Sequence, residues 1–302
     1  MRYLAVLLAC VAISIFGHSS AQDSALADIE NAKLSYDANP SGKNRKALLQ
    51  ALANYDGPPR NETVLAYVAV LDADGQGTQY DKIYESASAT ATHLESVANI
   101  LPRQYLEARF IAATASFNGT QDSNAMLEMA HVQGLASHQR DETQRPPDWA
   151  QTIRYNAEAW RMAMETYYTS NNVRNIPTQQ VDLILSEYRL SLPYTAPPDV
   201  AVAESDLPHC DGTFVQKPAM KYSRRKANKG MFGALLVEFE FDAEGKVANP
   251  VILASVPARN FDDDVLRTIK KWTFKAAGDE TPGVTCRLNR SNVIQPFSFY
   301  LK

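Results

Sequence analysis

Apolar residues recur three and four positions apart over most of the first 190 residues, which is the spacing of amphipathic helices. In residues 104–117, for example, Leu106, Phe110, Ala113 and Phe117 form one stripe. Proline, glycine and asparagine interrupt the pattern at regular places and mark the connections. The pattern predicts eight helices, at residues 25–36, 44–55, 62–71, 79–100, 104–117, 123–137, 149–168 and 178–190.

Eight helices with short connections predict an all-α helical array. Antiparallel pairs that repeat about every 35 to 40 residues are typical of a tetratricopeptide-like solenoid. No strict repeat signature aligns along these residues. A tetratricopeptide-like array and an irregular bundle therefore both stay open.

The pattern changes to alternation in the last third of the chain. Leu235, Val237, Phe239 and Phe241 alternate with mostly polar neighbours, which predicts a half-buried strand with one polar face. A hairpin turn at residues 242–245 follows, with a glycine that can take positive φ, and residues 246–256 return as a second strand.

A helix and a last strand complete this region. Asp262, Asp263 and Asp264 open an amphipathic helix, where acids suit the cap and the positive end of the helix dipole. Residues 293–301 form the last strand, with Phe297 and Phe299 on one face. Together these elements predict an α+β domain with an antiparallel sheet.

Charge and proline content divide the chain into two modules. Residues 23–206 hold 14 Lys or Arg against 24 Asp or Glu, whereas residues 208–302 hold 15 against 10. Between them, residues 191–207 contain three prolines and read as an extended linker. The predicted organisation is a signal peptide (1–21), an α-helical domain (22–190), the linker (191–207) and an α+β domain (208–302). The positive charge of the α+β domain is typical of a solvated surface, and we predict no nucleic-acid partner.

The first 21 residues read as a cleaved signal peptide. Arg2 precedes an apolar run of thirteen residues that ends at Phe16, and small residues stand before Gln22, the predicted first mature residue. Thirteen residues are too few for a membrane span, which needs about twenty. Cys10 could belong to a lipoprotein signal, but the apolar run continues past it. We therefore expect a soluble, periplasmic chain with no transmembrane segment.

Two cysteines, Cys210 and Cys286, remain after the signal peptide. An even pair in an oxidising compartment favours a disulfide, which would stabilise the domain by about 4 kcal/mol. The alternative is a reactive thiol, since His209 adjoins Cys210. The absence of a Cys-x-x-Cys motif favours the disulfide.

The sequence contains no familiar catalytic motif. It has no Gly-x-Ser-x-Gly, Walker loop, Gly-x-Gly-x-x-Gly or His-Glu-x-x-His pattern. Glu128 and His131 make a single Glu-x-x-His, where a di-metal bundle needs two. Asp72 and Asp74 resemble the start of a calcium-binding loop. The twelfth position of such a loop requires a glutamate, and here it is Ile83. We predict a protein that is not an enzyme and that has no catalytic residue, cofactor or metal site.

A group of motifs in residues 216–302 resembles the C-terminal domain of the TonB family. The motifs are Pro218 with Tyr222, Gly233, the strand 239–242 leading to Gly245, Phe261 with Asp262 and Leu266, Trp272 with Phe274, and the aromatic last strand. The resemblance implies that the last strand is a sheet edge to which an extended peptide of an outer-membrane receptor adds as a further strand. Carried over to this chain, the partner-binding edge is Ser291, Asn292, Val293, Ile294, Gln295, Phe297, Ser298, Phe299 and Tyr300.

The resemblance gives two hypotheses for function. In the first, the chain is a non-catalytic periplasmic protein that binds an envelope partner in transport, with a TonB-dependent outer-membrane receptor as the candidate. In the second, it is a periplasmic scaffold whose helices bind partners and whose TonB-like domain is structural. A homodimer through the C-terminal domain is compatible with both.

Overall fold

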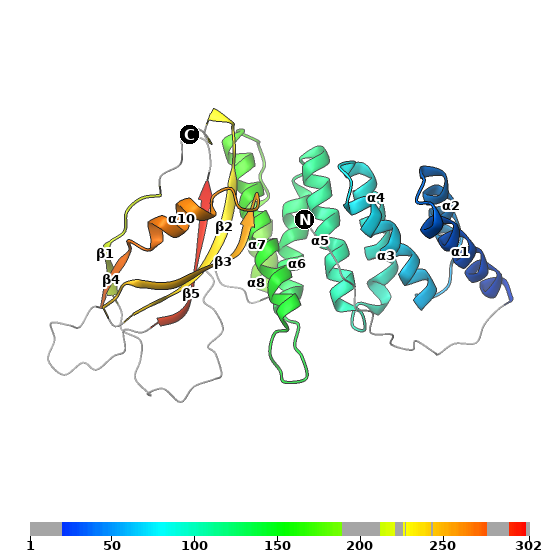
Figure 1. The fold of residues 1–302 in the computed structure, drawn as a ribbon, viewed down its shortest axis with the longest axis horizontal. Coiled ribbons are helices and arrows are strands. Elements are labelled where there is room, and N and C mark those ends of the chain that lie inside the picture. The colour runs from blue at the N-terminus through cyan, green and yellow to red at the C-terminus, as the bar shows by residue number, and fades with distance from the viewer. Residues whose placement is uncertain are drawn as a thin grey trace. The chain divides into compact units, whose positions relative to one another are not determined.

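The computed structural model describes residues 20–188, 212–220, 226, 228–242, 244–276 and 290–299. Its contacts divide the chain into two compact units, Met1–Glu128 and Met129–Lys302. Figure 1 shows helices throughout the N-terminal part and strands in the C-terminal part. The predicted class, an α-helical array followed by an α+β domain with an antiparallel sheet, is confirmed.

The first unit consists of antiparallel helices joined by short turns. Its described elements are α1 (Ser20–Ala38), α2 (Gly42–Ala53), α3 (Asn61–Gly75), α4 (Tyr80–Leu94), the 3₁₀ turn η1 (Glu95–Val97), α5 (Pro102–Thr120) and the start of α6 (Asn124–Ser137). The helix predicted at residues 79–100 is shorter than expected, because the chain tightens into η1. Pro102 then occupies the first turn of α5, where its missing N–H costs nothing.

Apolar side chains and one ion-pair network hold these helices together. Ile29, Leu48 and Val70 belong to a buried cluster shared by α1, α2 and α3. Beside it, Arg45 donates to both carboxylate oxygens of Asp74, at 2.9 and 2.7 Å. Asp74, which the sequence placed in a calcium-like pattern, is thus the partner of an arginine.

The second unit combines the remaining helices with strands. Its described elements are the rest of α6, α7 (Asp148–Ser170), α8 (Thr178–Glu187), β1 (Gly212–Gln216), β2 (Gly233–Phe241), β3 (Val247–Val256), α10 (Asp262–Ile269), β4 (Thr273–Ala276) and β5 (Arg290–Phe299). The described strands form an antiparallel three-stranded sheet in the order β3-β2-β5 and a two-stranded β1-β4 ribbon. The short strands β1 and β4 were not predicted.

The turn between β2 and β3 is the predicted acidic hairpin. The Asp242 carboxylate accepts the backbone N–H of Lys246 at 2.7 Å and that of Glu244 at 3.1 Å. Gly245 has φ +72°, and a Cβ there would lie 1.9 Å from the carbonyl oxygen of Phe274. Only glycine fits this position.

The α10 face of the sheet carries the predicted aromatic core. Phe239, Trp272 and Phe299 are buried there with Val265 and Ile269 of α10. The three aspartates lie in the first turn of α10, as expected. None of them caps the helix: residue 261, a phenylalanine, holds the cap position without a side-chain bond.

The opposite face of the same sheet is covered by α7 (Figure 1). Ala159 and Ala163 of α7 are fully buried against Leu236, Val256 and other residues of the three strands. The expected polar face of β2 is therefore wrong for its first half, where both faces are buried. The predicted domain boundaries at residues 190 and 207 lie outside the described residues and stay predictions.

Candidate functional site

The predicted binding edge lies on β5, at one end of the three-stranded sheet. Within the described part of the chain, β5 pairs on one side only, with β2. The register sets Ser298 opposite Ala234 and Ile294 opposite Glu238. The structure thus places Ser291, Asn292, Val293, Ile294, Gln295, Phe297, Ser298 and Phe299 along one edge strand. Tyr300 lies outside the described residues, as do Cys210 and Cys286.

Side chains from β5 anchor the strand on both faces of the sheet. Phe299 stacks on Phe261 at 4.2 Å between ring centroids, and Phe297 packs on the same α10 side. Ile294 is buried on the α7 side. These side-chain contacts hold β5 in the sheet without the backbone groups on its outer side.

Pro296 shows which backbone groups of β5 point outward. In an antiparallel ladder, pairs that exchange two hydrogen bonds alternate with pairs that exchange none. Pro296 has no N–H to give, so its pair with Leu236 is of the second kind and its carbonyl points away from β2. The register from Val293 to Phe299 is continuous, so the backbone groups of Ile294 and Ser298 point outward as well.

The other edge of the sheet, β3, is a poorer template for a further strand. Its pairing with β2 shifts register twice, and Asn249 sits at φ 46°. Irregular edges of this kind discourage strand addition. Of the two edges, β5 has the longer regular run of outward groups.

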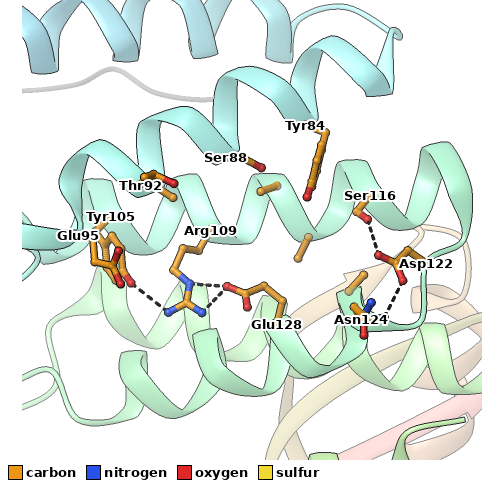
Figure 2. A pocket seen from close by; sticks show the side chains of 14 residues that line it. Tyr84, Ser88, Thr92, Glu95, Tyr105, Arg109, Ser116, Asp122, Asn124 and Glu128 are labelled. Atoms are coloured by element: carbon orange, nitrogen blue, oxygen red, sulfur yellow. Dashed lines mark hydrogen bonds and ion pairs between the residues drawn. The ribbon is translucent and has the colours of Figure 1, made fainter. Parts of the chain in front are cut away.

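A groove in the first unit was not predicted from the sequence. It has a volume of about 380 Å³ and lies between α4, α5 and the first turns of α6 (Figure 2). Arg109 of α5 donates to Glu128 of α6, and its Nη1 donates to the hydroxyl of Tyr105 at 3.1 Å. Burial lowers the pKa of Arg109, but the hydrogen bond and the charge of Glu128 together with Tyr105 outweigh burial and raise it, so the side chain stays charged. Because its walls come from three separate helices, the groove leaves no pattern in the sequence.

The single Glu-x-x-His pattern does not form a metal site. Glu128 pairs with Arg109, and the His131 ring lies 6.3 Å from that of Tyr188. In the part of the chain that is described, no three His, Cys, Asp or Glu side chains gather around a common point.

His93 of α4 is a titratable group in a confined place. Its Nε2 lies 2.7 Å from the hydroxyl oxygen of Thr63, and its ring lies 4.7 Å from that of Tyr67. Burial lowers the pKa of His93 to about 4. The folded protein therefore favours the neutral form of the His93 imidazole.

We expect the first unit to lose stability as the pH falls from 6.5 to 4. The unfolded chain binds a proton at His93 in this window and the folded chain does not, so protonation favours unfolding. Because the ring is partly exposed, the loss is about 1 to 2 kcal/mol. Urea unfolding followed by helical circular dichroism should show a flatter pH dependence in His93→Gln. The exposed His138 supplies the control: an equal flattening in His138→Gln would contradict the assignment.

Comparison with known proteins identifies the C-terminal part. The family described as the Gram-negative bacterial TonB protein C-terminal matches residues 218–295, about a quarter of the chain. Among solved structures, the solution NMR structure of the Pseudomonas aeruginosa TonB C-terminal domain is similar at 24% identity, over 30% of this chain and 86% of that one, with a TM-score of 0.25. The comparison with curated proteins gives no match. Of the helices that are described, none combines the length and hydrophobicity of a membrane span. Residues 218–295 therefore match the TonB C-terminal family, and in this chain they follow an α-helical array in sequence.

Proposed function

We propose that this chain is an exported, non-catalytic binding protein whose β5 edge accepts an extended peptide from a partner in the cell envelope. The observation that carries the proposal is the regular register of β5 from Val293 to Phe299, which among the described strands pairs with β2 alone, so that the backbone groups of Ile294, Pro296 and Ser298 point outward. Added-strand recognition takes its affinity from backbone hydrogen bonds and its selectivity from side-chain contacts, and it needs no reaction. The peptide of a TonB-dependent outer-membrane receptor is the partner that fits a TonB C-terminal domain.

The edge also limits which peptides fit. The carbonyl of Pro296 already accepts the side-chain amide of Gln295 at 3.0 Å. An incoming strand must displace the Gln295 amide from the Pro296 carbonyl or form its hydrogen bonds to either side of it. The backbone groups of Ile294 and Ser298 lie on those two sides. The N–H groups of these two residues are therefore the main donors offered to the peptide.

Export and location form part of the same proposal. The apolar run in residues 1–21 supports secretion with Gln22 as the first mature residue, and a TonB-type domain fits the periplasm. A Cys210–Cys286 disulfide suits that oxidising compartment. The homodimer through the C-terminal domain stays a prediction.

A second candidate function is that of a scaffold in which the TonB-type domain is structural. The packing of α7 on the sheet favours it, because the domain then serves as a platform for a helix of the same unit. The two candidates differ in whether the β5 edge binds a peptide at all.

We expect Ser298→Pro to weaken peptide binding about fivefold. The substitution removes an outward N–H, and one backbone hydrogen bond contributes about 1 kcal/mol. Ser298→Ala keeps the N–H and should bind like the parent. The measurement is isothermal titration of candidate receptor peptides, with circular dichroism and urea unfolding to verify that the variant is folded.

The result also decides between the two candidate functions. A folded Ser298→Pro variant that binds as tightly as the parent rules out strand addition at this edge and leaves the scaffold. Equal weakening by Ser298→Ala would mean that the side chain, not the backbone, makes the contact.

A further inference from the structure

We propose that the groove between α4, α5 and α6 is a second binding site, for an extended peptide that carries a lysine or arginine beside an apolar side chain. This site lies in the first unit and is independent of the β5 edge. The inference depends on the shape of the groove, its charge and its exposed aromatic wall.

The shape of the groove fits a stretch of chain. Ala112, Ala113 and Ala125 are buried along its floor, where small side chains leave space. From Tyr105 to Ser116 the floor follows twelve residues of α5, whose eleven steps rise about 16 Å. About five extended residues cover that distance. The volume of about 380 Å³ is near the lower end for ligand sites, enough for one or two side chains.

The charge of the groove favours a cation. Three carboxylates line it, from Glu95, Asp122 and Glu128, against one guanidinium, from Arg109. That guanidinium is already engaged by Glu128 and by the hydroxyl of Tyr105. An acidic ligand would have to compete for it, whereas a basic one meets a net negative lining.

One exposed tyrosine, Tyr84, gives the cation and its alkyl stem a surface to pack on, whereas the Arg109 guanidinium already lies over the ring of Tyr105 at 5.5 Å. Tyr84 lines the groove from α4 although 48% of its surface is exposed, and Tyr105 lines it at the end where Glu95 lies (Figure 2). Tyrosine faces attract ammonium and guanidinium groups, and the methylene stem covers the rest of the ring. An exposed aromatic ring in a groove with a net negative lining therefore matches a basic side chain.

Fluorescence anisotropy on the full mature chain tests the inference. The probes are labelled nonapeptides with a phenylalanine between two lysines, and matched peptides with glutamine or glutamate in place of lysine. The lysine peptide should bind best, and its binding should weaken as salt rises. Tyr84→Ala should weaken it about tenfold, and Glu95→Gln about threefold.

Matched controls separate the groove from other surfaces. Tyr80 is also an exposed tyrosine of α4 but does not line the groove, and Glu30 is an exposed acid of α1. Tyr80→Ala, Glu30→Gln and Ser298→Pro should leave binding unchanged. Failure of the lysine peptide to bind at 1 mM, equal or tighter binding of the glutamate peptide, or equal losses in Tyr80→Ala and Tyr84→Ala would each overturn the proposal.

Discussion

A fragment of residues 208–302 is expected to aggregate or to remain unfolded, whereas a fragment of residues 122–302 should fold cooperatively. The shorter fragment contains all the residues that match the TonB C-terminal family but lacks α7. Removal of α7 exposes one face of the sheet, which carries Ala234, Leu236, Ala254, Val256 and Ile294, all buried in the full chain.

The expected effect is large compared with the stability of a domain. Exposure of a buried Leu, Ile or Val side chain costs about 1.5 to 3 kcal/mol, so these positions together cost about 5 kcal/mol or more. Small domains are stable by only about 5 to 15 kcal/mol. A contiguous apolar face that loses its cover also promotes association between copies.

Substitutions in the full chain test the same contact without truncation. Ala163→Arg places a charge in the fully buried contact between α7 and the sheet, and Thr152→Arg places the same charge on the exposed side of α7. We expect Ala163→Arg to lower the melting temperature strongly and Thr152→Arg to have little effect. A 208–302 fragment that is monomeric and unfolds cooperatively in sedimentation and calorimetry would show that α7 is dispensable.

The contact between α7 and the sheet also shows where sequence reasoning stops. Periodicity correctly predicted a helix near residues 149–168, and its stripe through Ile153, Ala157 and Met164 is buried. A stripe does not say which element covers it, however, and a second buried surface at Ala159 and Ala163 carries no strong apolar signal. Alanine is common on exposed helix faces too, so only the fold shows its role.

Local chemistry was the better guide in the sheet. The Asp242–Gly245 turn and the strands on either side follow from turn residues and alternation, and both are found as predicted. The ribbon of β1 and β4 was missed because strands of five and four residues are too short to show alternation. The β5 edge was reached through a family resemblance, and its outward groups can be assigned only with the register of Pro296 against Leu236.

The groove could not be predicted for a related reason. Tyr84, Arg109 and Glu128 belong to three helices and come together only when these helices pack. In the sequence, Glu128 stands out only through His131 three positions further on, as part of a metal-type motif. Its partner Arg109 lies 19 positions away in the chain.

Glu158→Leu is expected to destabilise the second unit by about 3 to 5 kcal/mol. Glu158 and Arg161 of α7 are only 2% and 5% exposed, so both charges are removed from water. Burial raises the pKa of Glu158, while the charges of Arg161 and Arg154 lower it. Loss of the carboxylate leaves buried guanidinium groups without this compensating charge, and arginine cannot relieve the cost by losing a proton.

Substitution of the partner, Arg161→Met, is expected to have a different pH dependence of stability. That difference tests whether the two buried charges stabilise one another. In Arg161→Met the buried Glu158 loses a compensating charge, but it can take up a proton. Its folded pKa then lies further above the unfolded value, so the folded state binds more protons and the variant regains stability as the pH falls. The double variant Glu158→Leu/Arg161→Met should cost less than the sum of the two single changes, because neither charge is left behind. Urea unfolding at pH 5 and pH 8 gives these free energies, with Glu187→Leu at the exposed end of α8 as the control. Additive single effects, or a Glu158→Leu cost no greater than that of the control, would mean that the two buried charges do not stabilise one another.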